Sequence, residues 1–274
     1  MLLMIEALLL ISAAVGEDLR AAAAVKGQIF PLDMAVNSVD DDFKGCRENM
    51  ANLVKTEYLQ KELNNSAEFN KAWKKGLEHG QKDYSKDNLT SNHSVAIYVY
   101  TDDMVFRDFN NDTRYGKQNY TNKTYKWYSL HFLLADAIQI LKKTQKGCMT
   151  TYRRTNVKFN ENVLNTTVRF GSFASSSLHS NKTIFGNVSC FNISTCYGAE
   201  VTKYSKLPRE REWLIPPYEM FNVIDVKTRR DQKDLWCDTV FVLNSTGTKS
   251  DLNCALFRGP SPKISIMFGM EQMF

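Results

Sequence analysis

The chain has 274 residues, of which 43% are hydrophobic, a composition typical of a globular protein with one sizeable core. Its formal net charge is +5, and its basic clusters are short, such as Lys142-Lys143 and Arg229-Arg230. A nucleic-acid-binding protein is expected to concentrate basic residues in a stripe with interleaved aromatics. The sequence lacks such a stripe, so we expect no nucleic-acid partner.

The first sixteen residues resemble a secretory signal peptide. Leu8-Leu9-Leu10-Ile11 forms an apolar run, and Ala14-Val15-Gly16 offers small residues for cleavage. The run is far shorter than the roughly 20 apolar residues of a membrane span. The alternative is a buried N-terminal helix, since Glu6 lies close to the run and no basic residue precedes it. We expect a signal peptide over 1–16 and a single secreted, monomeric domain over 17–274.

N-x-Ser/Thr sequons and cysteines also indicate the secretory route. Eleven sequons are well above chance for this length, so we expect many of them to be exposed and glycosylated. Six cysteines without a C-x-x-C pair argue against a zinc ribbon or a redox motif and favour three disulfides, for which spacing leaves fifteen pairings open. The sequons begin at Asn64, Asn88, Asn92, Asn111, Asn119, Asn122, Asn165, Asn181, Asn187, Asn192 and Asn244.

Helical periodicity dominates the first half, about residues 33–145. Ser38 and Asp41 form the pattern of a capping box, which predicts a helix start there. A second helix is expected from Ser66 to Gly80, and a third near residues 131–143 carries an apolar core stripe. The residues at helical spacing are Phe43, Cys46, Met50, Leu53 and Val54, then Phe69, Trp73 and Leu77, then Leu130, Leu133, Leu134, Ala137, Ile138 and Leu141.

The second half, about residues 146–274, has the texture of short strands. Segments rich in Val, Ile, Phe and Tyr alternate with Gly, Asn and Ser, and Pro216-Pro217 interrupts one of them. Because helices precede strands instead of alternating with them, we expect an α+β fold and not a Rossmann sheet. The expected strands are Met149–Arg153, Val168–Phe173, Trp213–Ile215, Met220–Val226, Thr239–Leu243 and Lys263–Phe268.

Several familiar catalytic motifs are absent from the sequence. The histidines, His79, His93, His131 and His179, are isolated from one another, and no metal-binding spacing occurs, so we expect no metal. The sequence has no glycine-rich phosphate loop and no G-x-S-x-G elbow. Hydrolases and kinases that depend on these motifs are therefore excluded.

Three short segments carry candidate chemistry. The arginine fork of Tyr152-Arg153-Arg154-Thr155 can bind a phosphate, although the segment taken alone is more typical of a solvated basic pair at a strand end. Hydroxyls in Phe173-Ala174-Ser175-Ser176-Ser177 can hold a sugar or orient a carboxylate, or form a polar strand end. In extended backbone, Glu210 and Glu212 would point to one side, and their repulsion would raise one pKa. The alternative for this last segment is a charged surface stretch.

Together the three segments follow the order Arg, Ser, Glu-x-Glu, and the chain resembles the vertebrate ecto-ADP-ribosyltransferases. Flanking residues extend the resemblance over nearly all of the chain after the signal segment. They include Leu32-Asp33-Met34-Ala35, Ser38-Val39-Asp40-Asp41, Trp127-Tyr128-Ser129-Leu130-His131-Phe132, Arg169-Phe170-Gly171-Ser172, Thr195-Cys196-Tyr197-Gly198-Ala199, Leu214-Ile215-Pro216-Pro217-Tyr218-Glu219 and Asn253-Cys254-Ala255-Leu256.

The resemblance implies a cleft between two small packed sheets that binds NAD as co-substrate. It implies that Arg153 binds the NAD phosphates and that Ser175 contacts the nicotinamide-side ribose. Glu212 would be the catalytic carboxylate, which hydrogen-bonds the ribose and stabilises the oxocarbenium-like transition state. Glu210 would orient and deprotonate an acceptor arginine of a target protein, and Phe185 would stack on nicotinamide.

The resemblance further implies the disulfides Cys46–Cys254 and Cys148–Cys196, which leaves Cys190 and Cys237 to pair with each other. The sequence departs from the family at Arg154, which stands where relatives often have glycine beside the nicotinamide amide. The tail after Cys254 lacks the long apolar end of a glycolipid-anchor signal, so we expect secretion. Two alternatives stay open beside the arginine-directed transferase: an NAD glycohydrolase using the same site, and a secreted binding glycoprotein without turnover.

Overall fold

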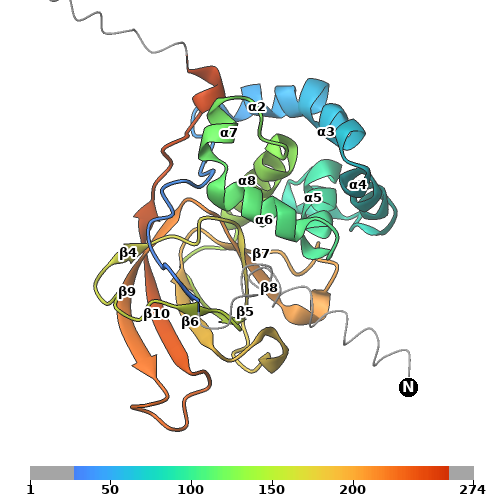
Figure 1. The fold of residues 1–274 in the computed structure, drawn as a ribbon. Coiled ribbons are helices and arrows are strands. Elements are labelled where there is room, and N and C mark those ends of the chain that lie inside the picture. Colours follow the sequence, from blue (N-terminus) through green and yellow to red (C-terminus); the bar gives the residue numbers. More distant parts are fainter. Residues whose placement is uncertain (1–27, 259–274) are drawn as a thin grey trace, which may run out of the picture.

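The computed structural model describes residues 28–258, in which a helical half precedes a strand-rich half (Figure 1). This arrangement confirms the α+β class. The expected signal peptide and the expected strand Lys263–Phe268 lie outside the described residues. The helical elements before the sheet are α2 (Arg47–Leu53), the π-helical turn η1 (Val54–Tyr58), α3 (Leu59–Asn65), α4 (Ala67–His79), η2 (Tyr84–Asp87), α5 (Ser91–Thr101), α6 (Phe106–Tyr115), α7 (Lys117–Thr121) and α8 (Tyr128–Lys142).

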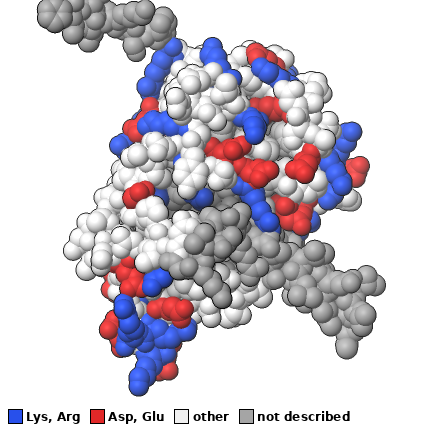
Figure 2. All heavy atoms as spheres, in the orientation of Figure 1, with Lys and Arg blue, Asp and Glu red and all other residues white. Residues whose placement is uncertain are grey.

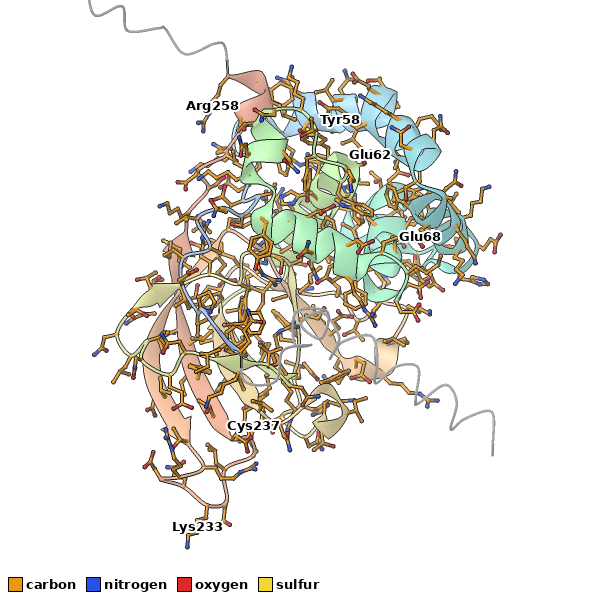
Figure 3. The ribbon with its side chains drawn as sticks, viewed as in Figure 1. Tyr58, Glu62, Glu68, Lys233, Cys237 and Arg258 are labelled. Carbon is orange, nitrogen blue, oxygen red and sulfur yellow. A yellow bond between two sulfur atoms is a disulfide. The ribbon has the colours of Figure 1, made fainter. Side chains whose placement is uncertain are left out.

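Helix α8 forms the centre of the helical half and confirms the third predicted helix. Its apolar stripe is buried, together with Ser129 and His131. The Glu62 carboxylate of α3 accepts the backbone N–H of Ser129 at 3.1 Å, so it satisfies a free donor in the first turn of α8 (Figure 3). Burial raises the pKa of Glu62 to about 8, although its hydrogen bonds to Ser129 lower it. A buried carboxyl group therefore caps the central helix.

The predicted helix start at Ser38 is wrong, because the first helix, α2, begins at Arg47. The Asp41 carboxylate accepts hydrogen bonds from the backbone N–H groups of Phe43 at 2.8 Å and Cys254 at 3.0 Å, and from the Tyr120 hydroxyl at 2.7 Å. These bonds hold the segment against distant parts of the chain. Tertiary contacts thus override the local capping pattern.

Helix α4 confirms the second predicted helix. The Ser66 side chain accepts the backbone N–H of Phe69, and Gly80 follows the last helical residue. The expected position of Leu77 on the buried face is wrong, since this residue is 45% exposed. Gly76 lies on that face instead, and a Cβ atom there would come within 2.8 Å of Val95 Cγ1. The missing side chain allows α4 and α5 to approach closely.

Eight strands form one mixed sheet in the order β4-β9-β10-β6-β2-β5-β8-β7, and β1 pairs with β3 separately. Strands β2 and β5 are joined by a single residue pair, Tyr152 with Ser177. This seam divides the sheet into a five-strand group and a three-strand group, where we expected two small packed sheets. The strands are β1 (Ile29–Phe30), β2 (Met149–Thr155), β3 (Lys158–Phe159), β4 (Thr167–Val168), β5 (Ala174–Ser177), β6 (Ser189–Thr195), β7 (Ala199–Glu200), β8 (Glu212–Ile215), β9 (Glu219–Thr228) and β10 (Thr239–Thr248).

Most of the predicted strands that fall within the described residues are present. The strand expected over Val168–Phe173 is wrong beyond Val168, where β4 ends. The next residue, Arg169, bonds to the N-terminal segment instead, with its Nη1 2.6 Å from Asp40 Oδ2. Strand β6, which pairs with both β2 and β10, was not expected. Its alternating residues Phe191 and Ile193 stand among Ser, Asn and Thr, so the segment reads as a loop with sequons.

Three disulfides join the parts of the chain: Cys46–Cys254, Cys148–Cys196 and Cys190–Cys237. The first two are the pairings that the resemblance implies, and the third joins the two cysteines that it leaves over. The first joins the start of the helical half to the segment after β10. The second joins the segment before β2 to the end of β6, and the third joins β6 to the β9–β10 hairpin (Figure 3).

The described surface carries most of the sequons and mixed charges. Nine sequon asparagines are exposed, whereas Asn92 on α5 and Asn192 on β6 are half-buried, so the expectation of exposure is wrong for these two. Lys and Arg gather at the tip of the β9–β10 hairpin (Figure 2), but four acidic residues between 225 and 238 balance the four basic ones there. Within residues 28–258, no helix is long and apolar enough to span a bilayer.

Candidate active site

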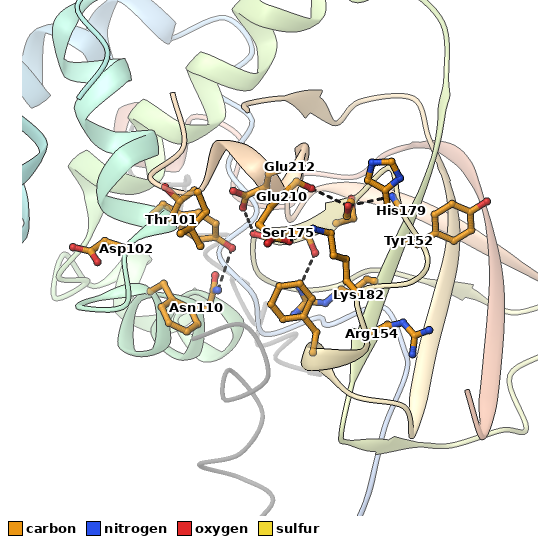
Figure 4. A pocket seen from close by; sticks show the side chains of 17 residues that line it. Thr101, Asp102, Asn110, Tyr152, Arg154, Ser175, His179, Lys182, Glu210 and Glu212 are labelled. Carbon is orange, nitrogen blue, oxygen red and sulfur yellow. Dashed lines mark hydrogen bonds and ion pairs between the residues drawn. The ribbon is translucent and has the colours of Figure 1, made fainter. Parts of the chain in front are cut away.

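The five predicted site residues line one pocket at the seam of the sheet (Figure 4). Arg153 comes from β2, Ser175 from β5 and Glu212 from the first position of β8. Glu210 ends the short helix η4 (Pro208–Glu210), and Phe185 ends η3 (Thr183–Phe185). Because β5 pairs with both β2 and β8, residues far apart in sequence meet in one cavity.

Glu212 is a buried carboxylate whose two oxygens are both held. Ser175 Oγ donates to Oε1 at 2.6 Å, and Ser205 Oγ donates to Oε2 at 2.9 Å. Burial raises the pKa of Glu212, against the lowering effect of these two hydroxyls and of Arg153, while the nearby charge of Glu210 raises it further. A negative charge fixed in a low-dielectric cavity can stabilise a positive charge that develops beside it.

Arg153 provides the cationic side of the pocket. Its guanidinium donates to the Ser175 carbonyl oxygen at 2.7 Å, and the residue is 9% exposed. It also lines a second groove, between the N-terminal segment and α6, with Phe30 and Arg114. Guanidinium groups bind phosphate oxygens through several parallel N–H donors. The arrangement therefore suits a substrate whose anionic group binds the Arg153 guanidinium.

Glu210 reaches the pocket by a different backbone path than the sequence predicts. Arg211 adopts a left-handed conformation, with φ 48° and ψ 56°, and Glu210 belongs to a 3₁₀ turn. The expectation that Glu210 and Glu212 share one extended segment is therefore wrong. Both carboxylates nevertheless line the same cavity. The Glu210 carbonyl accepts the Ser177 hydroxyl at 2.8 Å, which attaches the turn to β5.

Phe185 closes the pocket from the loop between β5 and β6. The residue is 8% exposed and precedes Gly186, which has φ 121°. A Cβ atom at Gly186 would lie 2.4 Å from the backbone carbon of Thr155 and 2.6 Å from the backbone nitrogen of Asn156. Only glycine fits both this conformation and this approach. The loop can therefore pack against the end of β2 and present its aromatic ring.

Arg154 turns its guanidinium away from Glu212 (Figure 4). Its Nε donates to the Ser180 carbonyl at 2.6 Å and its Nη1 to the Gly186 carbonyl at 3.1 Å. The guanidinium also lies over the Trp236 ring, 4.6 Å from its centroid. The arginine that replaces the family glycine therefore holds both ends of the Phe185 loop.

Several residues that line the pocket or bond to Glu212 were not predicted from the sequence. Ser205 lies in a loop and belongs to no motif, and Lys182 stands inside a sequon. Tyr100 and Phe106, from α5 and α6, form part of the wall on the helical side, and the Tyr100 hydroxyl donates to the Phe173 carbonyl at 2.9 Å. Within residues 28–258, no cluster of His, Cys, Asp and Glu is arranged to hold a metal ion.

An anion-binding arginine beside a buried carboxylate held by serines suits the transfer of a glycosyl group from an anionic nucleotide, a reaction in which positive charge develops on the sugar. The family model for NAD:arginine ADP-ribosyltransferases matches residues 32–250, and the chain belongs to this family. It is 31% identical to mouse T-cell ecto-ADP-ribosyltransferase 2, over 88% of this chain and 82% of the relative. The chain is 33% identical to human ecto-ADP-ribosyltransferase 4, over 85% of this chain and 75% of the relative.

Further relatives agree with this assignment. Chicken NAD(P)(+)–arginine ADP-ribosyltransferase 1 is 30% identical over 83% of this chain and 73% of the relative. The crystal structure of the eucaryotic mono-ADP-ribosyltransferase ART2.2 has a TM-score of 0.67 and 28% identity, and covers 84% of this chain and 100% of that one. A mutant of ART2.2 has been solved in complex with NADH. Relatives named ecto-enzymes and three disulfides fit an extracellular location.

Proposed function

We propose that this protein transfers one ADP-ribose unit from NAD to an arginine side chain of a target protein and releases nicotinamide. The observation that carries the proposal is the convergence of Arg153, Ser175, Glu212 and Glu210 on one pocket, with Ser175 bonded to Glu212 at 2.6 Å. Family membership supports the co-substrate, and the names of the chicken relatives support arginine as the acceptor.

In the proposed mechanism, Arg153 binds the NAD phosphates and Phe185 stacks on the nicotinamide ring. Nicotinamide leaves with the bonding electron pair of its bond to the ribose, and positive charge develops on the sugar. Glu212 lies at the ribose, where its carboxylate stabilises that charge. Ser175 contacts the same ribose and holds Glu212 in place.

Glu210 completes the transfer by acting on the acceptor. Arginine is effectively always protonated in water, so its guanidinium is a poor nucleophile until a base removes a proton. Glu210 takes that proton as the guanidinium nitrogen forms its bond to the ribose carbon. Water in place of the acceptor gives NAD hydrolysis, and Glu212 supports that reaction without Glu210. Hydrolysis is therefore the second candidate activity.

Labelled NAD with agmatine, a small guanidine acceptor, tests the proposal on protein produced through a secretory pathway. We expect ADP-ribosyl-agmatine and free nicotinamide from the wild-type protein. Glu212→Gln should lower both products by about 100-fold or more, because the charge that stabilises the transition state is lost. Nicotinamide release without transfer would identify a glycohydrolase, and neither product would identify a binding protein. Full activity of Glu212→Gln would remove Glu212 from its role.

We also propose that the protein acts as a secreted monomer. Within a single chain, Arg153, Ser175, Glu210 and Glu212 already converge on one pocket, so the proposed chemistry needs no residue from a second subunit. The apolar run at the start of the sequence supports secretion, and the exposed sequons support glycosylation. Secretion and glycan attachment are tested by expressing the full sequence in cultured cells and analysing the medium by mass spectrometry.

A further inference from the structure

A lysine cation lies on the acceptor carboxylate. Lys182 Nζ lies 3.2 Å from Glu210 Oε2, and both side chains line the pocket (Figure 4). The two side chains are 25% and 19% exposed, so the ion pair is partly shielded from water. Lys182 belongs to the β5–β6 loop, whereas Glu210 belongs to η4. The contact therefore joins two loops across the site.

The loop that carries Lys182 is held in place at its two ends. Arg154 donates to the Ser180 carbonyl at 2.6 Å and to the Gly186 carbonyl at 3.1 Å. Lys182 Nζ also lies 3.5 Å from the Arg209 carbonyl, next to Glu210. The ammonium group is thus kept close to the Glu210 carboxylate by the surrounding structure.

This contact conflicts with the proposed role of Glu210. A guanidinium binds a carboxylate most strongly through two parallel N–H bonds, one to each oxygen. One of the Glu210 oxygens already faces Lys182. Both cations cannot occupy the same side of that oxygen, because their charges repel each other at this separation.

We propose that Lys182 is an acceptor-specificity residue that competes with the acceptor guanidinium for Glu210. An acceptor binds productively only when it displaces the lysine ammonium. A guanidinium can do so, since it forms two bonds where the ammonium forms a point contact. An amine acceptor has no such advantage over Lys182. The inference rests on the proposed function, because Glu210 is the acceptor carboxylate only in a transfer reaction.

The test measures agmatine binding in the Glu212→Gln protein saturated with NAD, so that no turnover is needed. Isothermal titration calorimetry compares this parent with versions that also carry Lys182→Met or Lys182→Arg. We expect Lys182→Met to lower the agmatine Kd by about twofold to fivefold, the size of an ion pair near the protein surface. Lys182→Arg should raise the Kd, because its guanidinium holds Glu210 bidentately.

Lys203→Met is the matched control, because it removes the same charge from an ion pair with Asp87 outside the pocket. It should leave the agmatine Kd unchanged. An unchanged or higher Kd in Lys182→Met, or no agmatine binding in any version, overturns the inference. If the proposed function fails, the wild-type assay produces no ADP-ribosyl-agmatine. The agmatine Kd values of the Lys182 variants are measured separately and still show whether Lys182 competes for Glu210.

Discussion

At the scale of single residues, two carboxylates in one pocket have different surroundings. Glu212 is buried and accepts two serine hydroxyls, whereas Glu210 is half-buried and faces a lysine. Burial raises the pKa of Glu212, so its ionised form is lost at a higher pH than that of an ordinary glutamate. The buried group suits charge stabilisation, and the more accessible one suits proton transfer with an incoming acceptor.

The division of roles predicts separate losses. Glu210→Gln keeps the shape of the side chain but cannot accept the guanidinium proton. Transfer to agmatine should therefore fall about 100-fold or more, which is the usual contribution of a general base. NAD hydrolysis should be largely retained, because Glu212 and its two hydroxyl donors are unchanged. Both rates come from one assay of labelled NAD, and an equal loss of both would contradict the division.

The sequence could single out Arg153, Ser175 and Glu212 as candidates, because each stands in a recognisable segment and the order of the segments is specific. It could not predict Ser205 or Lys182, since both lie in loops whose path depends on tertiary contacts. The left-handed residue Arg211 was missed for a related reason. Non-glycine residues rarely adopt this conformation, so an extended backbone was the better expectation from sequence alone.

At the scale of elements, the spacing of apolar residues predicts an element well where those residues form its buried face. The apolar stripe of α8 and the residues Phe69 and Trp73 of α4 are buried as their helical spacing predicts, whereas Leu77 is exposed. The helix expected at Ser38 failed because Asp41 bonds to partners elsewhere in the chain. Strand β6 was missed because its outer residues are polar, although its pairing with two neighbours places it inside the sheet.

The cap of α8 predicts a pH-dependent stability. The pKa of Glu62 rises from 4.5 to about 8 on folding, so the folded state binds one proton more than the unfolded state between these values. This group therefore lowers stability as pH rises, by up to about 1.4 kcal/mol for each pH unit. Glu62→Gln removes the effect and keeps an acceptor for Ser129.

Thermal melting between pH 5 and pH 8 measures this contribution. As pH rises, the melting temperature of the Glu62→Gln protein minus that of the wild type should increase. Glu68→Gln on the exposed start of α4 serves as the control and should follow the wild type. A constant difference between wild type and Glu62→Gln across this range would show that Glu62 does not change its protonation on folding.

At the scale of the whole molecule, the site depends on how the two halves meet. The seam between β2 and β5 brings the arginine strand beside the serine strand, and α5 and α6 form part of the remaining wall. The disulfide Cys46–Cys254 joins the helical half to the segment after β10, across 208 residues. The order and composition of the segments along the sequence indicate a helical half and a strand-rich half. Only the folded chain shows that the pocket forms where the two halves meet.

A crystal structure of the Glu212→Gln protein with NAD shows whether this pocket is where the co-substrate binds. We predict the pyrophosphate within hydrogen-bond distance of the Arg153 guanidinium, the nicotinamide-side ribose beside Ser175 and residue 212, and the nicotinamide ring against Phe185. NAD bound elsewhere on the molecule, or in this pocket with its ribose away from Ser175 and residue 212, would contradict the account.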